Sequence, residues 1–436
     1  MTPFEIGLIA LAAMGVLVLF GLWVPIALMA CSFGGVWAIK GSPELAGKLL
    51  ALSANDTLQS YYFGVVPLFV LMGFVVSESG MGRDAYDVAN TLFRRLRGGL
   101  GVGTVGANAI FAAITGISIA SAAVFTRIAV PQMLRHGYTA RFAVGVVAGS
   151  SVLGMLIPPS LLLILYGVIT EQSIGHLFLA GIGPGLLLAC VFGIGVVLGA
   201  IFLPGHVQPN REAGDEIPGL TARQMLVKGL PIAILIVYVL GGIYGGWFTP
   251  VEAGAMGAIG ALVIGFAKRS LTLAGLWRVL VETGLVTAAV CFLIIAAQMY
   301  ARMLAFSGIP AGFGELAAHA DLGLMGLMLL YILIVVALGM ILDSSSIMLI
   351  LVPIMLPVLA PMNVDLIWFG IVTVIAIEIG LLTPPFGLSV YVIKSTLDDP
   401  TITLGDIFAG AAPFALMMLM VLGLVLAFPV IATGLL

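Results

Sequence analysis

The chain has 436 residues, of which 61% are hydrophobic and 8% are charged, and its net charge is −3. Soluble domains carry about a quarter charged residues, so this composition excludes a soluble protein and predicts an integral membrane protein. The apolar runs are continuous and often exceed about 18 residues, which favours spanning helices over a β-barrel of alternating apolar and polar residues. The slightly acidic charge gives no indication of a nucleic-acid partner.

The apolar segments predict the membrane elements in chain order. The N-terminal stretch MTPFEIGLIALAAMGVLVLF has no basic region and no clear cleavage site, so it is interpreted as a first spanning helix and not as a removed signal peptide. Two segments, 100–134 and 322–361, are long enough to enter the membrane and return, and each is predicted to be a hairpin. The full set covers residues 5–39, 62–79, 100–134, 142–173, 176–203, 225–243, 247–267, 283–305, 322–361, 364–395 and 405–434.

Three stretches between these segments have a different character. SANDTLQSYYFG and GRDAYDVANTLFRRLRGG mix charged and apolar residues at helical spacing. They are predicted to be interfacial helices, with their Tyr and Arg residues at the level of the lipid head groups. The loop 204–222 is polar and rich in Pro and Gly, and it is predicted to be the boundary between two halves of the chain.

The Lys and Arg residues indicate how the chain is oriented. With a cytoplasmic N-terminus and two hairpins that return to their starting side, thirteen of them fall in cytoplasmic loops. Three, Lys40, Lys48 and Arg302, fall on the outer side, and Arg127 lies inside the first hairpin. This bias follows the positive-inside rule and supports both the orientation and the hairpins. It does not distinguish a re-entrant hairpin from two full crossings.

Three pairs of short words recur in the same order in the two halves. VPQML (130–134) pairs with VPIML (352–356), and VVSESGM (75–81) pairs with MLAFSGI (303–309). Two Gly-x-x-x-Pro-Pro words form the third pair, at 154–159 and 380–385. The orientation places the open end of the first hairpin in the cytoplasm and that of the second on the outer side. Inverted repeats, which are typical of secondary transporters, are therefore predicted.

Each half has two positions at which a helix is predicted to break inside the membrane. One is the hairpin tip, at 115–121 or 339–346, and the other is the Pro-Pro word. Tandem proline removes two backbone donors and leaves upstream carbonyls unpaired, and such breaks persist only where they line a cavity or meet a ligand. Free carbonyls and hydroxyls suit an alkali or alkaline-earth cation, whereas helix N-termini suit an anion. The pattern predicts that a cation and an anion bind side by side, which is the physical basis of symport.

Asp343 is the charged residue of the second hairpin tip, and the repeat aligns it with Ser121. A charge at this depth is costly, so Asp343 is predicted to be a cation ligand or its charge balance, with the following serines, 344–346, supplying oxygens. It is also expected to cap the helix that follows. A proton-coupled role of Asp343 remains open.

Two other charged residues lie within apolar segments. Arg127 is expected to meet a substrate carboxylate, to pair with a buried acid such as Glu378, or to extend towards the cytoplasm. Glu378 is interpreted as bracing the scaffold in preference to binding an ion. The three cysteines and four histidines show no ligand spacing, so neither a disulfide framework nor a metal site beyond a coupling ion is predicted.

Five stretches together resemble the large membrane subunit, the M or DctM-like family, of tripartite ATP-independent periplasmic (TRAP) transporters. The resemblance runs from about residue 65 to residue 395 and covers both halves. The stretches are TGISIASAAVFTRIAVPQM, GSSVLGMLIPPSLLLILYGVIT, GGWFTPVEAGAMG, ILDSSSIMLILVPIMLPV and EIGLLTPPFGLSVYVIK.

The resemblance implies a multi-pass transporter of the elevator type in a bacterial inner membrane. Members of the family take up organic anions such as C4-dicarboxylates and sugar or keto acids, driven by sodium and without a further cofactor. They use a soluble periplasmic substrate-binding protein (P) and a small four-helix membrane subunit (Q). Because the chain begins at a first helix like that of the family, the small subunit is expected from another polypeptide. An enzyme activity is not expected.

The resemblance also implies sites. The substrate is expected between the two tips, near Thr115, Ser344 and Thr383, with Arg127 as a further contact. Members of the family often have a small residue where this chain has Arg127, which marks either a class of anion or a local difference. One sodium site is expected at Gly116, Ser118, Ser121, Gly154 and Pro158, and a second at Asp343, Ser344, Ser345, Ser346, Gly380, Thr383 and Pro384.

The same likeness divides the chain into a scaffold and a transport domain. The transport domain is expected at 100–173 and 322–395, each part holding one hairpin and one broken helix. The scaffold is expected at 1–99, which includes an interfacial arm, and at 174–321, which includes the linker 204–222. Residues 396–436 are expected to form a C-terminal transmembrane helix.

Three other functions share some of these sequence features. A stand-alone sodium/dicarboxylate symporter has the same hairpins and breaks, and only the family words favour the tripartite system over it. An intramembrane hydrolase would use Asp343 with Glu378 as a pair of acids, but no metal-ligand motif or Ser–His pair accompanies them. A passive channel is disfavoured because paired breaks in inverted hairpins suit alternating access.

Overall fold

The computed structural model describes residues 1–202, 219–312, 323–397 and 399–436. These residues form helices joined by short turns, with no β-strand, and eight of the helices are long and apolar enough to cross a membrane. The prediction of an all-α polytopic membrane protein is confirmed. Most of the proposed linker 204–222 lies outside the described residues.

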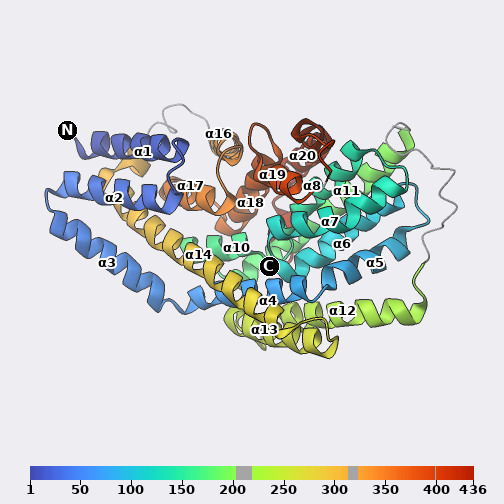
Figure 1. The fold of residues 1–436 in the computed structure, drawn as a ribbon. Helices are drawn as coiled ribbons and strands as arrows, with labels where there is room; N and C mark the ends of the chain where they lie inside the picture. Colours follow the sequence, from blue (N-terminus) through green and yellow to red (C-terminus); the bar gives the residue numbers. More distant parts are fainter. Residues whose placement is uncertain (203–218, 313–322, 398) are drawn as a thin grey trace.

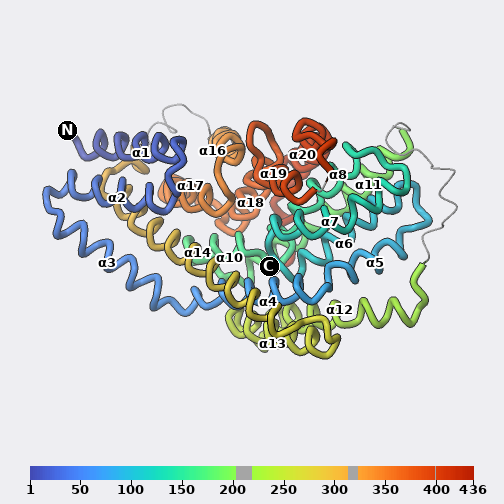
Figure 2. The backbone as a smooth tube through the Cα atoms, in the orientation of Figure 1, coloured from blue at the N-terminus to red at the C-terminus, as the bar shows by residue number. Residues whose placement is uncertain are grey.

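The first apolar segment contains two helices. α1 (Pro3–Leu19) is opened by a capping box between Thr2 and Glu5, and α2 (Val24–Lys40) begins with a proline in its first turn. Between them the chain turns at Gly21, whose φ is +85°. The two helices pack against each other, and the chain doubles back between them (Figure 2). The helix expected over the first twenty residues corresponds to α1, but the apolar segment 5–39, which the orientation treats as one crossing, contains two helices, because a left-handed glycine followed by proline ends one helix and starts another.

A long slanting path follows in each half of the chain. In the first half it consists of α3 (Pro43–Gln59), the short η1 (Tyr61–Gly64) and α4 (Val65–Glu78). In the second half a single helix, α14 (Leu273–Ser307), follows α12 (Ala222–Tyr244) and α13 (Pro250–Ala267). α14 packs along α3 and α4, as Figure 1 shows. The ends of the two paths match, because α4 and α14 are followed by Gly80 and Gly308, both with φ of +71°.

The two predicted hairpins are present. The first consists of α6 (Gly99–Thr115) and α7 (Ser118–Arg135), and the second of α16 (Gly323–Gly339) and α17 (Ser344–Leu359), which is followed by η2 (Ala360–Met362). Both Pro-Pro words interrupt helices as predicted. The first lies between α8–α9 (Ala140–Ser151 and Leu153–Leu156) and α10 (Leu161–Thr170). The second lies between α18 (Leu366–Leu382) and α19 (Leu388–Thr396).

The repeat is visible in the breaks themselves. Both Pro-Pro bonds, Pro158–Pro159 and Pro384–Pro385, are cis. Each half then closes with a long helix, α11 (Ile174–Phe202) or α20 (Leu404–Ala427), and the chain ends after α21 (Val430–Thr433). The same order of path, hairpin, broken helix and closing helix in both halves confirms the predicted internal repeat.

The core lies where the broken helices meet the hairpins. Every residue of α18 from Trp368 to Leu382 is buried, and so is every residue of α8 from Ala143 to Ser151. By contrast, α12, α13 and the first part of α14 expose large apolar side chains such as Val237, Val263 and Leu285. Exposed apolar faces of this extent suit lipid or a membrane partner.

Acidic residues of the amphipathic α5 (Met81–Phe93) anchor it to the second half of the chain. Asp84 pairs with Lys228 of α12, at 3.5 Å, and with Lys268, which follows α13. Asp87 also pairs with Lys228. These contacts join segments that the orientation places on the cytoplasmic side. They hold the element before the first hairpin against helices far away in the sequence.

Candidate functional site

The tip of the first hairpin lies against the first Pro-Pro break. α6 ends at Gly116, whose φ is +64°, and the carbonyl oxygen of Gly116 accepts a hydrogen bond of 3.1 Å from Leu161 N–H, just beyond the break. A Cβ at Gly116 would come within 2.4 Å of the Pro159 oxygen. A Cβ at Gly154 would come within 3.0 Å of the Ser118 nitrogen. Glycine is therefore required at Gly116 by close approach of backbone to backbone and by its positive φ, and a side chain at Gly154 would be tightly packed against the tip.

Two buried serine hydroxyls at this tip have incomplete hydrogen bonding within the described residues. Ser118 is the first residue of α7 and Ser121 lies one turn later, and both side chains are fully buried. Buried hydroxyls are normally paired, so each unpaired one calls for an explanation. The N-cap residue of α7 is Ile117, which provides no side-chain cap. The tip thus combines an uncapped helix N-terminus with free hydroxyl oxygens, which are ligands of the hard type that an alkali cation binds.

The tip of the second hairpin contacts the second Pro-Pro break in a similar way. The Met340 carbonyl oxygen accepts hydrogen bonds from the backbone N–H groups of Phe386 and Gly387, at 3.2 Å and 3.4 Å. Gly339 of α16 and Gly380 of α18 touch so closely that a Cβ at Gly380 would lie 2.6 Å from the Gly339 Cα. Each predicted sodium site is thus assembled from one tip and one break, as expected. Ion binding at these sites stays a prediction.

Asp343 is the N-cap of α17. Its Oδ2 accepts a hydrogen bond of 3.1 Å from the Ser346 N–H, and its Oδ1 accepts one from the Ser346 hydroxyl. The expected cap is therefore present. Asp343 and Ser345 are partly exposed, whereas Ser344 and Ser346 are buried. The second tip is more open than the first, because Pro384 is exposed and Pro158 is buried.

Glu378 connects the two tips. It lies on α18, is 1% exposed, and its Oε1 accepts a hydrogen bond of 3.3 Å from the hydroxyl of Ser344, the first residue of α17. The Ser118 side chain, at the start of α7, also approaches this carboxyl group. Oε2 has no hydrogen-bond partner among the described residues. The sequence singles out Glu378 as an acid in an apolar run, but it carries no signal that both hairpins converge on it.

The first residues of α7 and α17, which are the second helices of the two hairpins, also correct the repeat alignment. Both Ser118 and Ser344 are the first residues of their helices and both face Glu378, so these two serines are structurally equivalent. The alignment of Asp343 with Ser121 is therefore wrong. It rested on the VPQML and VPIML words, but Pro131 lies one helical turn further from the start of its helix than Pro353 does.

The predicted substrate residues lie in different surroundings. The hydroxyls of Thr115 and Thr383 donate to carbonyl oxygens of their own helices, those of Phe111 and Ile379, at 2.9 Å and 2.6 Å. Arg127 is exposed on α7 and forms no ion pair within the described part of the chain, so the expected pairing with Glu378 is not found. Substrate contact by these residues stays a prediction.

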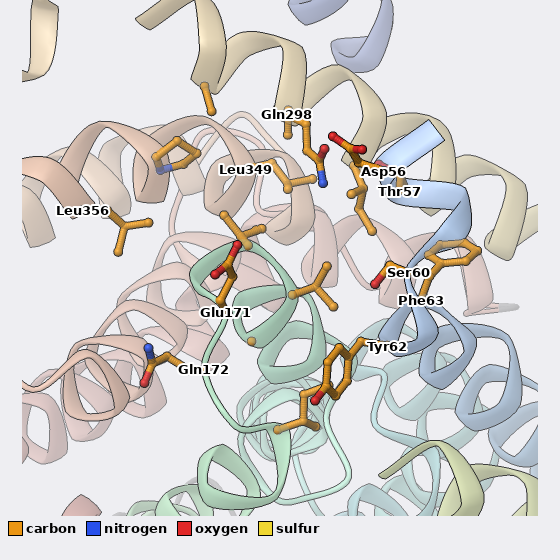
Figure 3. A pocket seen from close by; sticks show the side chains of 18 of the residues that line it. Asp56, Thr57, Ser60, Tyr62, Phe63, Glu171, Gln172, Gln298, Leu349 and Leu356 are labelled. Atoms are coloured by element: carbon orange, nitrogen blue, oxygen red, sulfur yellow. The ribbon is translucent and has the colours of Figure 1, made fainter. Parts of the chain in front are cut away.

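A cavity of about 980 Å³ opens elsewhere in the molecule (Figure 3). One wall comes from α3, η1 and α14, and the other from α10, the turn after it and α17. Arg302 of α14 lines it and donates a hydrogen bond of 2.6 Å to Asp56 of α3. Glu171, Gln172 and Gln298 point polar groups into the same space (Figure 3). None of the predicted site residues lines this cavity, and the sequence did not indicate it.

Comparison with known proteins places this geometry in context. The family model described as "Tripartite ATP-independent periplasmic transporter, DctM component" matches residues 6–431. The C4-dicarboxylate TRAP transporter large permease protein DctM of Pseudomonas aeruginosa is 34% identical, covering 92% of this chain and 92% of its own. The sialic acid TRAP transporter large permease protein SiaM of Vibrio cholerae is 31% identical, covering 84% of this chain and 83% of its own. The crystal structure of the Alcanivorax borkumensis YdaH transporter superposes with a TM-score of 0.62 at 17% identity, covering 89% of this chain and 90% of that one, which shows likeness of fold alone.

Proposed function

Since the chain belongs to the DctM component family of TRAP transporters and is a multi-pass inner-membrane transport protein rather than an enzyme, we propose that it performs sodium-coupled uptake of an organic anion. The observation that carries the proposal is the pairing of each hairpin tip with a Pro-Pro break. Around the first pair lie two fully buried serine hydroxyls whose hydrogen bonding is incomplete within the described residues. Oxygen ligands next to the uncapped N-terminus of α7 suit a cation and an anion bound close together.

The proposed substrate is a carboxylate. Two relatives, from Pseudomonas aeruginosa and Rhodobacter capsulatus, at 34% and 33% identity, are named for C4-dicarboxylate, and others for sialic acid or 2,3-diketo-L-gulonate. A dicarboxylate is therefore the first candidate. Its carboxylates would meet the N-terminal N–H groups of α7 and α17, because helix N-termini attract anions.

The proposed partners are a small membrane subunit and a periplasmic binding protein that delivers the anion. One relative, from Oleidesulfovibrio alaskensis, is named as a DctMQ permease, and this chain covers 64% of its length. The exposed apolar faces of α12, α13 and α14 offer a surface on which a membrane subunit would pack. The proposed sodium ligands are those expected from the sequence at each tip and break.

Uptake into proteoliposomes tests this proposal. The chain and its small subunit are reconstituted, and radiolabelled C4-dicarboxylates, sugar acids and keto acids are supplied with or without the binding protein and an inward sodium gradient. Concentrative uptake that requires both is the expected result. Uptake that needs sodium but not the binding protein would identify a stand-alone symporter. Uptake that follows a proton gradient and ignores sodium would contradict the sodium sites.

A further inference from the structure

Glu378 is a buried acid whose contacts are incomplete. Its side chain is 1% exposed at the centre of α18, and the neighbouring residues from Trp368 to Leu382 are all buried. One carboxylate oxygen accepts the Ser344 hydroxyl at 3.3 Å, and the other has no hydrogen-bond partner among the described residues. An uncompensated charge in such a place is costly, and residues of this kind inside membranes usually serve a function.

The unpaired oxygen of Glu378 belongs to a group of three. The hydroxyl oxygens of Ser118 and Ser121 are also fully buried, and within the described part of the chain Ser121 has no hydrogen-bond partner and Ser118 has none beyond its approach to Glu378. Ser118 approaches the Glu378 carboxyl, and Ser121 follows one turn later on the same face of α7. Gly154 closes this region, because its Cα lies so near the Ser118 backbone that even a Cβ would be crowded. The carboxyl of Glu378 and the two serine hydroxyls together supply buried oxygens of the kind that a hard monovalent cation binds and that a hydrophobic core does not satisfy.

No other charge on the surrounding elements neutralises Glu378. Several helices pack against α18 and carry titratable groups. Within the described residues, none of these groups forms a hydrogen bond or an ion pair with the Glu378 carboxyl. Nor does Arg127, the one basic residue that the sequence offered as a partner. The groups on those elements are Tyr166, His176, Cys190, Tyr331, Asp343, Asp365, Tyr391, Lys394 and Asp406.

Resting on the proposed sodium coupling, we propose that Glu378 supplies the fixed negative charge of the cation site at the first hairpin, with Ser118 and Ser121 as co-ligands. The first residues of α7 and α17 both face this carboxyl, so the cation would lie close to the start of each helix. Because Ser344 of the second hairpin is bound to the same carboxyl, a cation held at the first tip also orders the second. Glu378 thereby makes one ion act on both hairpins.

In the first half, no acid occupies the position equivalent to Glu378, and this difference supports a specific role of Glu378 in ion binding. The two Pro-Pro words align Gly380 with Gly154, so the position equivalent to Glu378 in the first half is Val152. Both hairpins are duplicated, but the acid that lies between them is present once. A residue that only braced each broken helix would be expected in both repeats.

Sodium binding to the purified complex of the chain with its small subunit tests this inference. The melting temperature is measured against NaCl, with choline chloride holding the ionic strength constant, because a ligand that binds the folded state raises the melting temperature by an amount that grows with the logarithm of its concentration relative to its dissociation constant. We expect Glu378→Gln, which keeps the shape and the hydrogen bond from Ser344, to need at least about tenfold more sodium for the same rise. The matched control is Glu252→Gln, because Gln also completes the capping box with Thr249, and it should titrate as the wild type does.

The outcomes separate the inference from the proposed function. If Glu378→Gln lowers the melting temperature without sodium but leaves the sodium titration unchanged, Glu378 is a brace only and the inference is overturned. If it titrates like the wild type in every respect, the inference is also overturned, while sodium coupling stands. If the wild type itself shows no response to sodium, sodium coupling fails and the inference fails with it. Ser118→Ala combined with Ser121→Ala gives a second test and should shift the titration in the same direction.

Discussion

Asp343 combines two roles that substitution separates. It caps α17 through the Ser346 N–H, and it places a partly exposed charge beside the second break. We predict that Asp343→Asn keeps the cap, because Asn caps helices as well as Asp does, and that it leaves the melting temperature without sodium close to the wild-type value. Asp343→Ala should lose about 1 kcal/mol of stability through the missing cap.

The uptake assay then reports on the charge alone. If Asp343 is a sodium ligand, Asp343→Asn should raise the sodium concentration for half-maximal uptake by about tenfold, since one charge-assisted contact is lost. Equal sodium dependence in the Asn variant and the wild type would leave Asp343 as a cap and nothing more. Ser53→Ala is a suitable control, because the Ser53 hydroxyl bonds only to the Leu49 carbonyl of its own helix.

At the level of elements, the division of 5–39 into α1 and α2 changes the expected position of the N-terminus. If both helices cross the membrane, the N-terminus lies on the same side as Lys40, at the end of α2. Residues 1–39 contain no Lys or Arg, so the positive-inside bias of the rest of the chain is unaffected. We therefore predict an outer N-terminus with the remaining loops as assigned from the sequence.

Cysteine labelling checks this topology. In a variant with Cys31, Cys190 and Cys291 replaced by serine, Thr2→Cys should react with a membrane-impermeant maleimide added to spheroplasts. Lys48→Cys is the control expected to react in the same way, and Arg97→Cys should react only after permeabilisation. Reaction of Thr2→Cys only after permeabilisation would show that α1 and α2 together make a single crossing.

At the level of the whole molecule, the 980 Å³ cavity lies between the helices expected to form the scaffold and those expected to carry substrate. α14 forms one wall and α17 the other, and the two helices are in contact. If the transport domain moves as a body, as the elevator hypothesis states, this interface must change during each cycle. A covalent bond across it should then stop transport, whereas a bond within the scaffold should not.

Cross-linking tests that movement. We predict that Gln298→Cys with Leu349→Cys, joined by a short bifunctional thiol reagent, loses nearly all uptake and regains it on reduction. The control pair, Tyr61→Cys with Thr249→Cys, replaces side chains whose oxygens lie 3.2 Å apart within the expected scaffold. Normal uptake by the cross-linked α14–α17 pair would exclude relative movement of these two helices as part of transport.

The amino-acid sequence by itself determined the class of protein, both hairpins, both broken helices and the repeat. These features follow from local chemistry: proline lacks an N–H, a charge or a cluster of serines interrupts an apolar helix, and lipid tolerates neither without compensation. The same local logic found Asp343 as a cap and the glycines of both breaks. Length and hydropathy do not reveal the turn at Gly21, because the residues on both sides of it are apolar and only the Gly…Pro spacing marks it.

Only the tertiary structure decided which of these pieces meet. Ser118, Glu378 and Ser344 are far apart along the chain, and nothing in their local sequence indicates that one carboxyl faces both hairpins. The equivalence of Ser118 with Ser344, the exposure of Arg127 and the cavity beside Arg302 likewise depend on how whole helices pack. Local sequence sets where a helix begins and breaks, but long-range contacts are selected by the joint packing of many side chains, which no single segment encodes.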